Sequence, residues 1–141
     1  MGKINLGRVV LGGLLAGLII CIGEYLLNDV VLEKLWMDAM AALNRPAIGT
    51  ESAALFIILF FALGIFSVWV YAAVRPRFGA GAMTAICAGL IVWFLASFFA
   101  SASMLPMNLF PRRLLFYAAL WELFEFPIAT LAGAWIYKEQ A

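Results

Sequence analysis

The chain has 141 residues, of which 67% are hydrophobic and 12% are charged, and its formal net charge is +1. A soluble domain is near half apolar and about a quarter charged, so this composition excludes an ordinary soluble protein and favours a membrane protein. The balanced charge gives no reason to expect nucleic acid as a partner. Histidine is absent, which removes the commonest general base and the usual haem ligand.

The first apolar stretch covers about residues 9–27, and only Glu24 interrupts it. A membrane-spanning helix needs about 20 largely apolar residues, so this stretch predicts a first span. It follows Lys3 and Arg8, as the apolar part of an export signal would, but no small-residue cleavage site comes after it. We therefore expect the stretch to be retained as a span.

The next segment, about residues 29–43, has charged side chains at helical spacing and an opposite apolar face that includes Trp36. This pattern predicts an amphipathic interfacial helix lying at the level of the lipid headgroups. A continuation of the first span beyond the bilayer is the alternative. Arg45 and Pro46 end the segment.

Three further spans are expected at about residues 52–74, 81–102 and 112–137. The sequence RPRFG at 75–79 is expected to end the second span, since Pro76 and two arginines do not suit a lipid-facing helix. The segment SMLPMNLFP at 103–111 is expected to be a loop, with its last proline leading into the fourth helix. The prediction is one all-α integral membrane domain over residues 1–141.

Helices in lipid pack closely through small residues at four-residue spacing, which predicts a compact four-helix bundle here. The residues expected at helix contacts are Gly13, Gly17, Gly81, Ala85, Gly89, Ala129 and Gly133.

Three acids share these small-residue faces. Glu122 and Glu125 lie on the face continued by Ala129 and Gly133, and Glu24 lies two turns beyond Gly17. They are therefore expected to point into the bundle or into an oligomer contact. At a rise of about 1.5 Å per residue, all three fall in the outer half of the bilayer at comparable depths. They can form one cluster if the first and fourth spans are neighbours.

Two functions fit such acids. Ionisable groups inside a membrane are costly and mark proton relays or cation sites, which makes Glu24, Glu122 and Glu125 candidates for a small proton- or cation-coupled transporter or channel. The alternative, favoured by the sequence, is a structural or accessory subunit in which hydrogen-bonded acids hold a bundle or a homo-oligomer together. No enzymatic activity, metal site or cofactor is expected, because E-x-x-E lacks the histidine of di-iron helices and no phosphate-binding loop is present.

The distribution of basic residues favours cytoplasmic N- and C-termini, chiefly because Arg75 and Arg77 crowd one short loop. A dual-topology protein is the alternative. The expected location is a bacterial inner membrane, with the lipid bilayer and a homo-oligomer or larger membrane complex as partners. Two short matches, AGLII at 16–20 with AGLIV at 88–92 and WVY at 69–71 with WIY at 135–137, raise the possibility of two parallel hairpins.

The stretches GGLLAGLIICIGEYLLN, LWMDAMAALNRP, VWVYAAVRPRFG and ATLAGAWIY, in this order, resemble those of small four-span bacterial membrane proteins of the domain-of-unknown-function type. This resemblance implies a multi-pass membrane protein and no particular activity. Small multidrug exporters also have four short spans and a glutamate in the first. Here, however, Glu24 comes late in its span and the fourth span has two further acids, so that resemblance is set aside.

Overall fold

The computed structural model describes residues 3–139, and every regular element within this range is a helix. Four helical stretches are long and apolar enough to cross a membrane: Leu6–Val31, Thr50–Phe78, Ala82–Met107 and Arg112–Ile136. In each, no more than 39% of the most apolar 18-residue window is buried inside the molecule. Large apolar side chains therefore cover the outside, which suits helices surrounded by lipid rather than by water.

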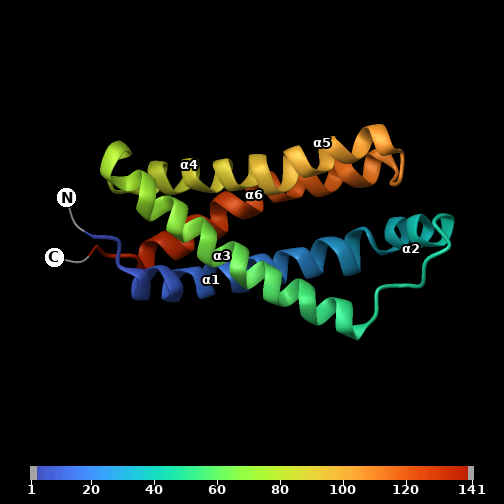
Figure 1. The fold of residues 1–141 in the computed structure, drawn as a ribbon, viewed down its shortest axis with the longest axis horizontal. Coiled ribbons are helices and arrows are strands. Elements are labelled where there is room, and N and C mark those ends of the chain that lie inside the picture. Colours follow the sequence, from blue (N-terminus) through green and yellow to red (C-terminus); the bar gives the residue numbers. More distant parts are fainter. Residues whose placement is uncertain (1–2, 140–141) are drawn as a thin grey trace.

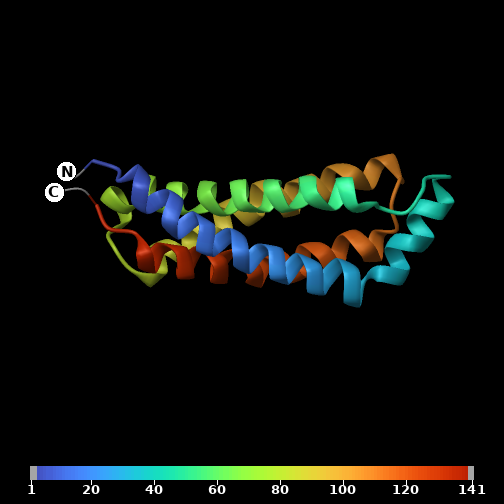
Figure 2. The ribbon, with the colours of Figure 1, turned by 90° about the horizontal axis from the view of Figure 1, so that it is seen from below.

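The long helices are arranged so that α1 (Leu6–Tyr25) contacts both α3 (Thr50–Phe78) and α6 (Arg112–Ile136), while α4 (Ala82–Trp93) contacts α6. Figure 1 shows α3 crossing α1 obliquely and α4 running beside α6, and Figure 2 shows α1 crossing α6 in the turned view. The helices that carry Glu24 and the other two acids are therefore neighbours.

A short helix, α2 (Glu33–Ala42), connects α1 to α3 and begins four residues later than the expected amphipathic helix. The residues before it belong to η1 (Leu26–Val31), a π-helical turn that continues α1. Trp36 of α2 packs edge-on against Phe110, with 5.7 Å between the ring centroids, and both border a small core around Leu114. This contact holds α2 over the beginning of α6, at the right of Figure 1.

RPRFG ends the second span as expected, but α3 first continues through Pro76 to Phe78, four residues beyond the expected end at residue 74. Proline removes one helical hydrogen bond and crowds the carbonyl group four residues earlier, and only two residues of helix follow it here. Gly79, whose φ is +86°, then ends the helix in a conformation that other residues rarely adopt.

The third helical stretch also extends further than expected, because part of the segment expected to be a loop is helical. After α4 it continues through η2 (Phe94–Phe99), a second π-helical turn, then α5 (Ala100–Met104) and η3 (Leu105–Met107). Pro106 does not prevent this, because it lies in the first turn of η3, where no intrahelical donor is required. Asn108, in the left-handed region at φ +51°, ends the stretch.

Glycines permit the closest helix contacts. A Cβ placed on Gly64 of α3 would lie 2.5 Å from the Cα of Gly17 and 2.6 Å from the carbonyl oxygen of Gly13. A Cβ on Gly89 of α4 would lie 2.5 Å from the Cα of Pro127 in α6. Real Cβ atoms are essentially never found that close to other atoms, so backbone meets backbone at both crossings.

Other residues expected at helix contacts are buried on α4 and α6. Gly133 of α6 faces Gly12 of α1, and Ala85 and Ala129 are completely buried. Gly81 was wrongly expected to pack, since it precedes α4 at φ +140° and a Cβ there would have nothing within 4 Å. Its role is conformational, in the short turn between α3 and α4.

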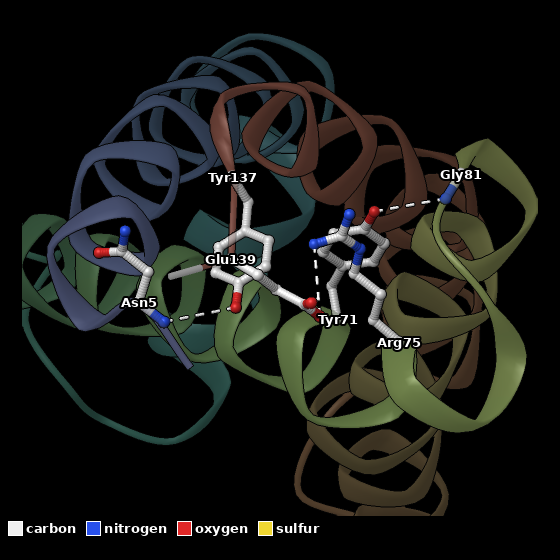
Figure 3. Close-up of polar contacts among 6 residues, drawn as sticks. All are labelled: Asn5, Tyr71, Arg75, Gly81, Tyr137 and Glu139. Atoms are coloured by element: carbon white, nitrogen blue, oxygen red, sulfur yellow. Dashed lines mark hydrogen bonds and ion pairs between the residues drawn. The ribbon is translucent and has the colours of Figure 1, made fainter. Parts of the chain in front are cut away.

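The end of the molecule near Asn5 and Tyr137 also holds the α3–α4 turn (Figure 3). The hydroxyl of Tyr137 accepts a hydrogen bond from the backbone N–H of Asn5, and that of Tyr71 accepts one from Gly81, both at 3.4 Å. Tyr71 and Tyr137 are the last residues of the matching segments WVY and WIY. Each contacts the residue directly before a long helix, Gly81 before α4 and Asn5 before α1. Arg75 forms an ion pair with Glu139 at 3.4 Å and lies over the Tyr137 ring.

Candidate functional site

Glu24 lies in the last turn of α1, immediately before the π-helical turn η1, and only 6% of it is exposed. The amide of Asn28, one turn later in η1, donates one hydrogen bond to the Glu24 carboxyl oxygen Oε2 at 2.7 Å and another to the Glu24 carbonyl oxygen at 3.0 Å. The buried carboxyl group of Glu24 therefore has a fixed donor.

Trp36 of α2 fixes the orientation of that donor. Its indole N–H donates to the Asn28 side-chain oxygen at 2.8 Å, and an indole nitrogen is a donor only. The Asn28 oxygen must therefore face Trp36, and the Asn28 NH₂ group must face Glu24. A flipped amide would lose all three hydrogen bonds.

Glu125 is the more buried of the two acids on α6, with 7% of its surface exposed. A side chain on Gly23 of α1 would collide with the Glu125 carboxyl group, so this group lies against the α1 backbone next to Glu24. Both carboxyl oxygens of Glu125 are buried, and neither accepts a hydrogen bond of good geometry from the described residues, although the Trp121 side chain is a close polar neighbour. Glu125 thus differs from Glu24, which has a donor.

Glu122 is half-buried, one turn before Glu125 on the same helix. Its side chain, like that of Glu125, lies within hydrogen-bonding reach of the Glu24 carboxyl group. Ser97 of η2 is its neighbour from the third helical stretch. Ser97 is 3% exposed, and its hydroxyl oxygen has no hydrogen-bond partner of good geometry among the described residues.

The polar groups around the acids come from two π-helical turns. Asn28 belongs to η1 and Ser97 to η2. A π-helical turn inserts an extra residue into an α-helix, changes the direction of its side chains, and is found frequently at functional sites. In this chain the two turns direct an amide and a hydroxyl toward acids on neighbouring helices.

No basic side chain neutralises these acids within residues 3–139. The ion pair found in this range is that of Arg75 with Glu139, at the end drawn in Figure 3. The same range contains no group of three or more His, Cys, Asp or Glu side chains arranged to hold a metal ion.

An apolar groove of about 430 Å³ lies beside the acids, between η1, α2 and α6. Leu27, Tyr117, Trp121 and Phe124 are among the side chains that line it. None of the three acids lines the groove, although Trp121 and Phe124 each precede an acid in sequence.

The sequence proposed the three acids as candidates, and in the structure Glu122 and Glu125 lie on α6, which contacts α1, with the Glu125 carboxyl group against Gly23 of α1. It did not identify Asn28 and Trp36 as a linked pair, because nothing in residue spacing predicts a π-helical turn. Tyr25, which follows Glu24 in sequence, and Tyr117 of α6 are 60% and 48% exposed. Comparisons with protein-family models, curated proteins and solved structures give no match to this chain.

Proposed function

We propose that this chain is a four-span integral membrane protein in which Glu24, Glu122 and Glu125 form one proton-exchanging site, acting in proton-coupled transport or conduction. The observation that carries the proposal is the buried carboxyl group of Glu125, which has no donor and lies beside a second buried acid. An isolated ionised carboxylate in such a place is very costly, whereas a protonated one can donate to Glu24.

Protons fit this site better than metal ions do. The described residues provide no metal-binding arrangement and no cationic partner for the acids. Adjacent carboxyl groups can share a proton and release it when the surroundings change. The unpartnered hydroxyl of Ser97 adds a polar group that can pass a proton to or from Glu122.

The proposed setting is a single membrane domain with α2 at the headgroup level and both termini in the cytoplasm. The amphipathic pattern of α2 and the crowding of Arg75 and Arg77 in one short loop support this setting. A bacterial inner membrane and a homo-oligomer remain part of the proposal.

The second candidate is a structural or accessory membrane subunit. The hydrogen bonds from Trp36 to Asn28 and from Asn28 to Glu24 favour it, because they tie α2 to α1 without any need for proton movement. In this alternative the acids join helices and do not carry protons.

Proton entry into liposomes distinguishes the two candidates. The full chain, reconstituted with a pH-sensitive dye inside the vesicles, is given an external acid jump. We expect wild-type protein to acidify the lumen, and Glu24→Gln, Glu122→Gln and Glu125→Gln to reduce the rate to that of protein-free vesicles. Glu51→Gln changes an exposed acid at the beginning of α3 and is the matched control.

Assembly is measured in parallel by size in mild detergent. Loss of proton entry by variants of unchanged size supports the proton-exchanging site. Absence of proton entry in the wild type, or a change in size that accompanies each loss, would support the structural subunit.

A further inference from the structure

We infer that Asn28 and Trp36 are positioning residues that place the negative charge of the site on Glu24 and leave the exchangeable proton on Glu125. This inference rests on the proposed proton-exchanging site and names the arrangement within it. Its basis is the hydrogen-bond geometry of the two acids, one of which has a fixed donor and the other none.

The Asn28 amide has a single orientation that satisfies its partners. Its oxygen accepts from the Trp36 indole, and its NH₂ group uses both protons on the carbonyl and carboxyl oxygens of Glu24. Every donor and acceptor position facing these partners is used in this one orientation. The Glu24 oxygen Oε2 therefore has to be an acceptor.

The surroundings of Glu24 favour its ionised form, and those of Glu125 favour its protonated form. A hydrogen bond to a carboxylate is roughly twice as strong as one to a neutral group, so the Asn28 donor favours the ionised form of Glu24. Ionised Glu125 would have two buried oxygens without a donor. Protonated Glu125 can donate its O–H to Glu24, with which it is in hydrogen-bonding reach, and this arrangement satisfies both groups.

Other groups facing Glu24 and Glu125 do not reverse this assignment. Glu122 adds a further acid from α6, and Ser97 faces Glu122 from η2. The Trp121 side chain faces Glu125, but it forms no hydrogen bond of good geometry with either carboxyl oxygen. Cys21, one turn earlier in α1, contributes a thiol whose sulfur contacts the Ile57 carbonyl oxygen at 3.9 Å. None of these groups supplies a positive charge that would favour an ionised Glu125.

The inference connects α2 with the site. Trp36 packs on Phe110 with its ring and holds Asn28 with its N–H group. A displacement of α2 would release the Asn28 amide, and Glu24 would lose the donor that favours its charge. The proton would then be shared between Glu24 and Glu125 rather than held on Glu125.

Infrared spectroscopy of the full chain in lipid nanodiscs at neutral pH tests this assignment. A protonated carboxyl group and a carboxylate have separate bands, and Glu→Gln substitutions assign each band to a residue. We expect Glu125→Gln to remove the protonated-carboxyl band and Glu24→Gln to remove intensity from the carboxylate band. Removal of the protonated band by Glu24→Gln or by Glu122→Gln would overturn the assignment.

The role of the positioning pair is tested with Asn28→Leu and Trp36→Phe. In either background the protonated-carboxyl band is expected to shift and broaden, because Glu24 and Glu125 now share one proton. Adding Glu24→Gln is expected to return the band to its wild-type position, because the proton then stays on Glu125. Asp29→Asn changes an exposed acid in the same turn and is the control, with no change expected. An unchanged band in both backgrounds, even with lower thermal stability, would show a merely structural role and overturn the inference.

The infrared and liposome measurements together distinguish failure of this inference from failure of the proposed function. If no protonated carboxyl band is found in the wild type, the proton site itself is wrong and the inference is overturned with it. If the band is found and assigned to Glu125 but no proton entry occurs in liposomes, transport is wrong and the charge assignment stands.

Discussion

At the scale of single residues, hydrogen-bond donors distinguish acids that otherwise look alike. Glu24 and Glu125 are both more than nine-tenths buried, yet Glu24 receives two hydrogen bonds from Asn28, one on its carboxyl group, and Glu125 receives none. Burying a polar group without a partner costs about 1–3 kcal/mol, and more for a charged group. The neutral form of Glu125 is therefore the one that suits its surroundings.

The substitution Glu125→Gln imitates that neutral form. Its amide can donate to Glu24 as the protonated acid does, so we expect the free energy of unfolding to stay within about 1 kcal/mol of wild type. Removing one partner from a buried ion pair would instead cost about 3–5 kcal/mol. Unfolding in mixed detergent micelles measures the difference, and a loss in the second range would contradict a protonated Glu125.

At the scale of helices, the close crossings were predictable because small residues at four-residue spacing mark them. Gly13 and Gly17 lie against Gly64 of α3, a partner that the spacing in α1 alone does not identify. The π-helical turns η1 and η2 were not predictable, because no residue pattern distinguishes them from α-helix. The polar groups nearest the acids lie in those turns.

The substitution Gly64→Ala tests the crossing of α1 and α3. The new methyl group would lie 2.5 Å from the Gly17 Cα, so the helices have to separate, at a cost of about 1–3 kcal/mol. Gly7→Ala in α1 is the matched control: its Cβ would meet only the Asn5 side chain at 3.5 Å. Because alanine suits a helix better than glycine, we expect Gly7→Ala to be neutral or to stabilise by up to about 1 kcal/mol. Equal effects in the unfolding assay would argue against backbone contact at this crossing.

At the scale of the whole molecule, the four long helices place Asn5, Tyr137 and the α3–α4 turn at one end and α2 at the other (Figures 1 and 3). The sequence predicted the number of spans because a long apolar stretch is a strong signal in a chain of this composition. It placed two ends too early, near Pro76 and Pro106, because each helical stretch continues through the proline and ends only before Gly79 or Asn108, whose φ angles are positive.

Cysteine labelling tests this sidedness. In a background where Cys21 and Cys87 are replaced by alanine, single cysteines are introduced at Arg77 and at Asn44. We expect a membrane-impermeant maleimide to label Arg77→Cys only from the cytoplasmic side and Asn44→Cys only from the opposite side, because Arg77 lies in the last turn of α3 and Asn44 lies in the segment that leads into its first turn. Labelling of both positions from both sides would indicate dual topology.

The central claim is that the acids of α1 and α6 exchange protons, and proton entry driven by an imposed membrane potential tests it most directly. Liposomes containing equal amounts of wild-type protein or Glu125→Gln receive a potential that is negative inside. We expect acidification of the lumen with wild-type protein and none above protein-free vesicles with Glu125→Gln. Equal acidification by both proteins, or none by either, would contradict it.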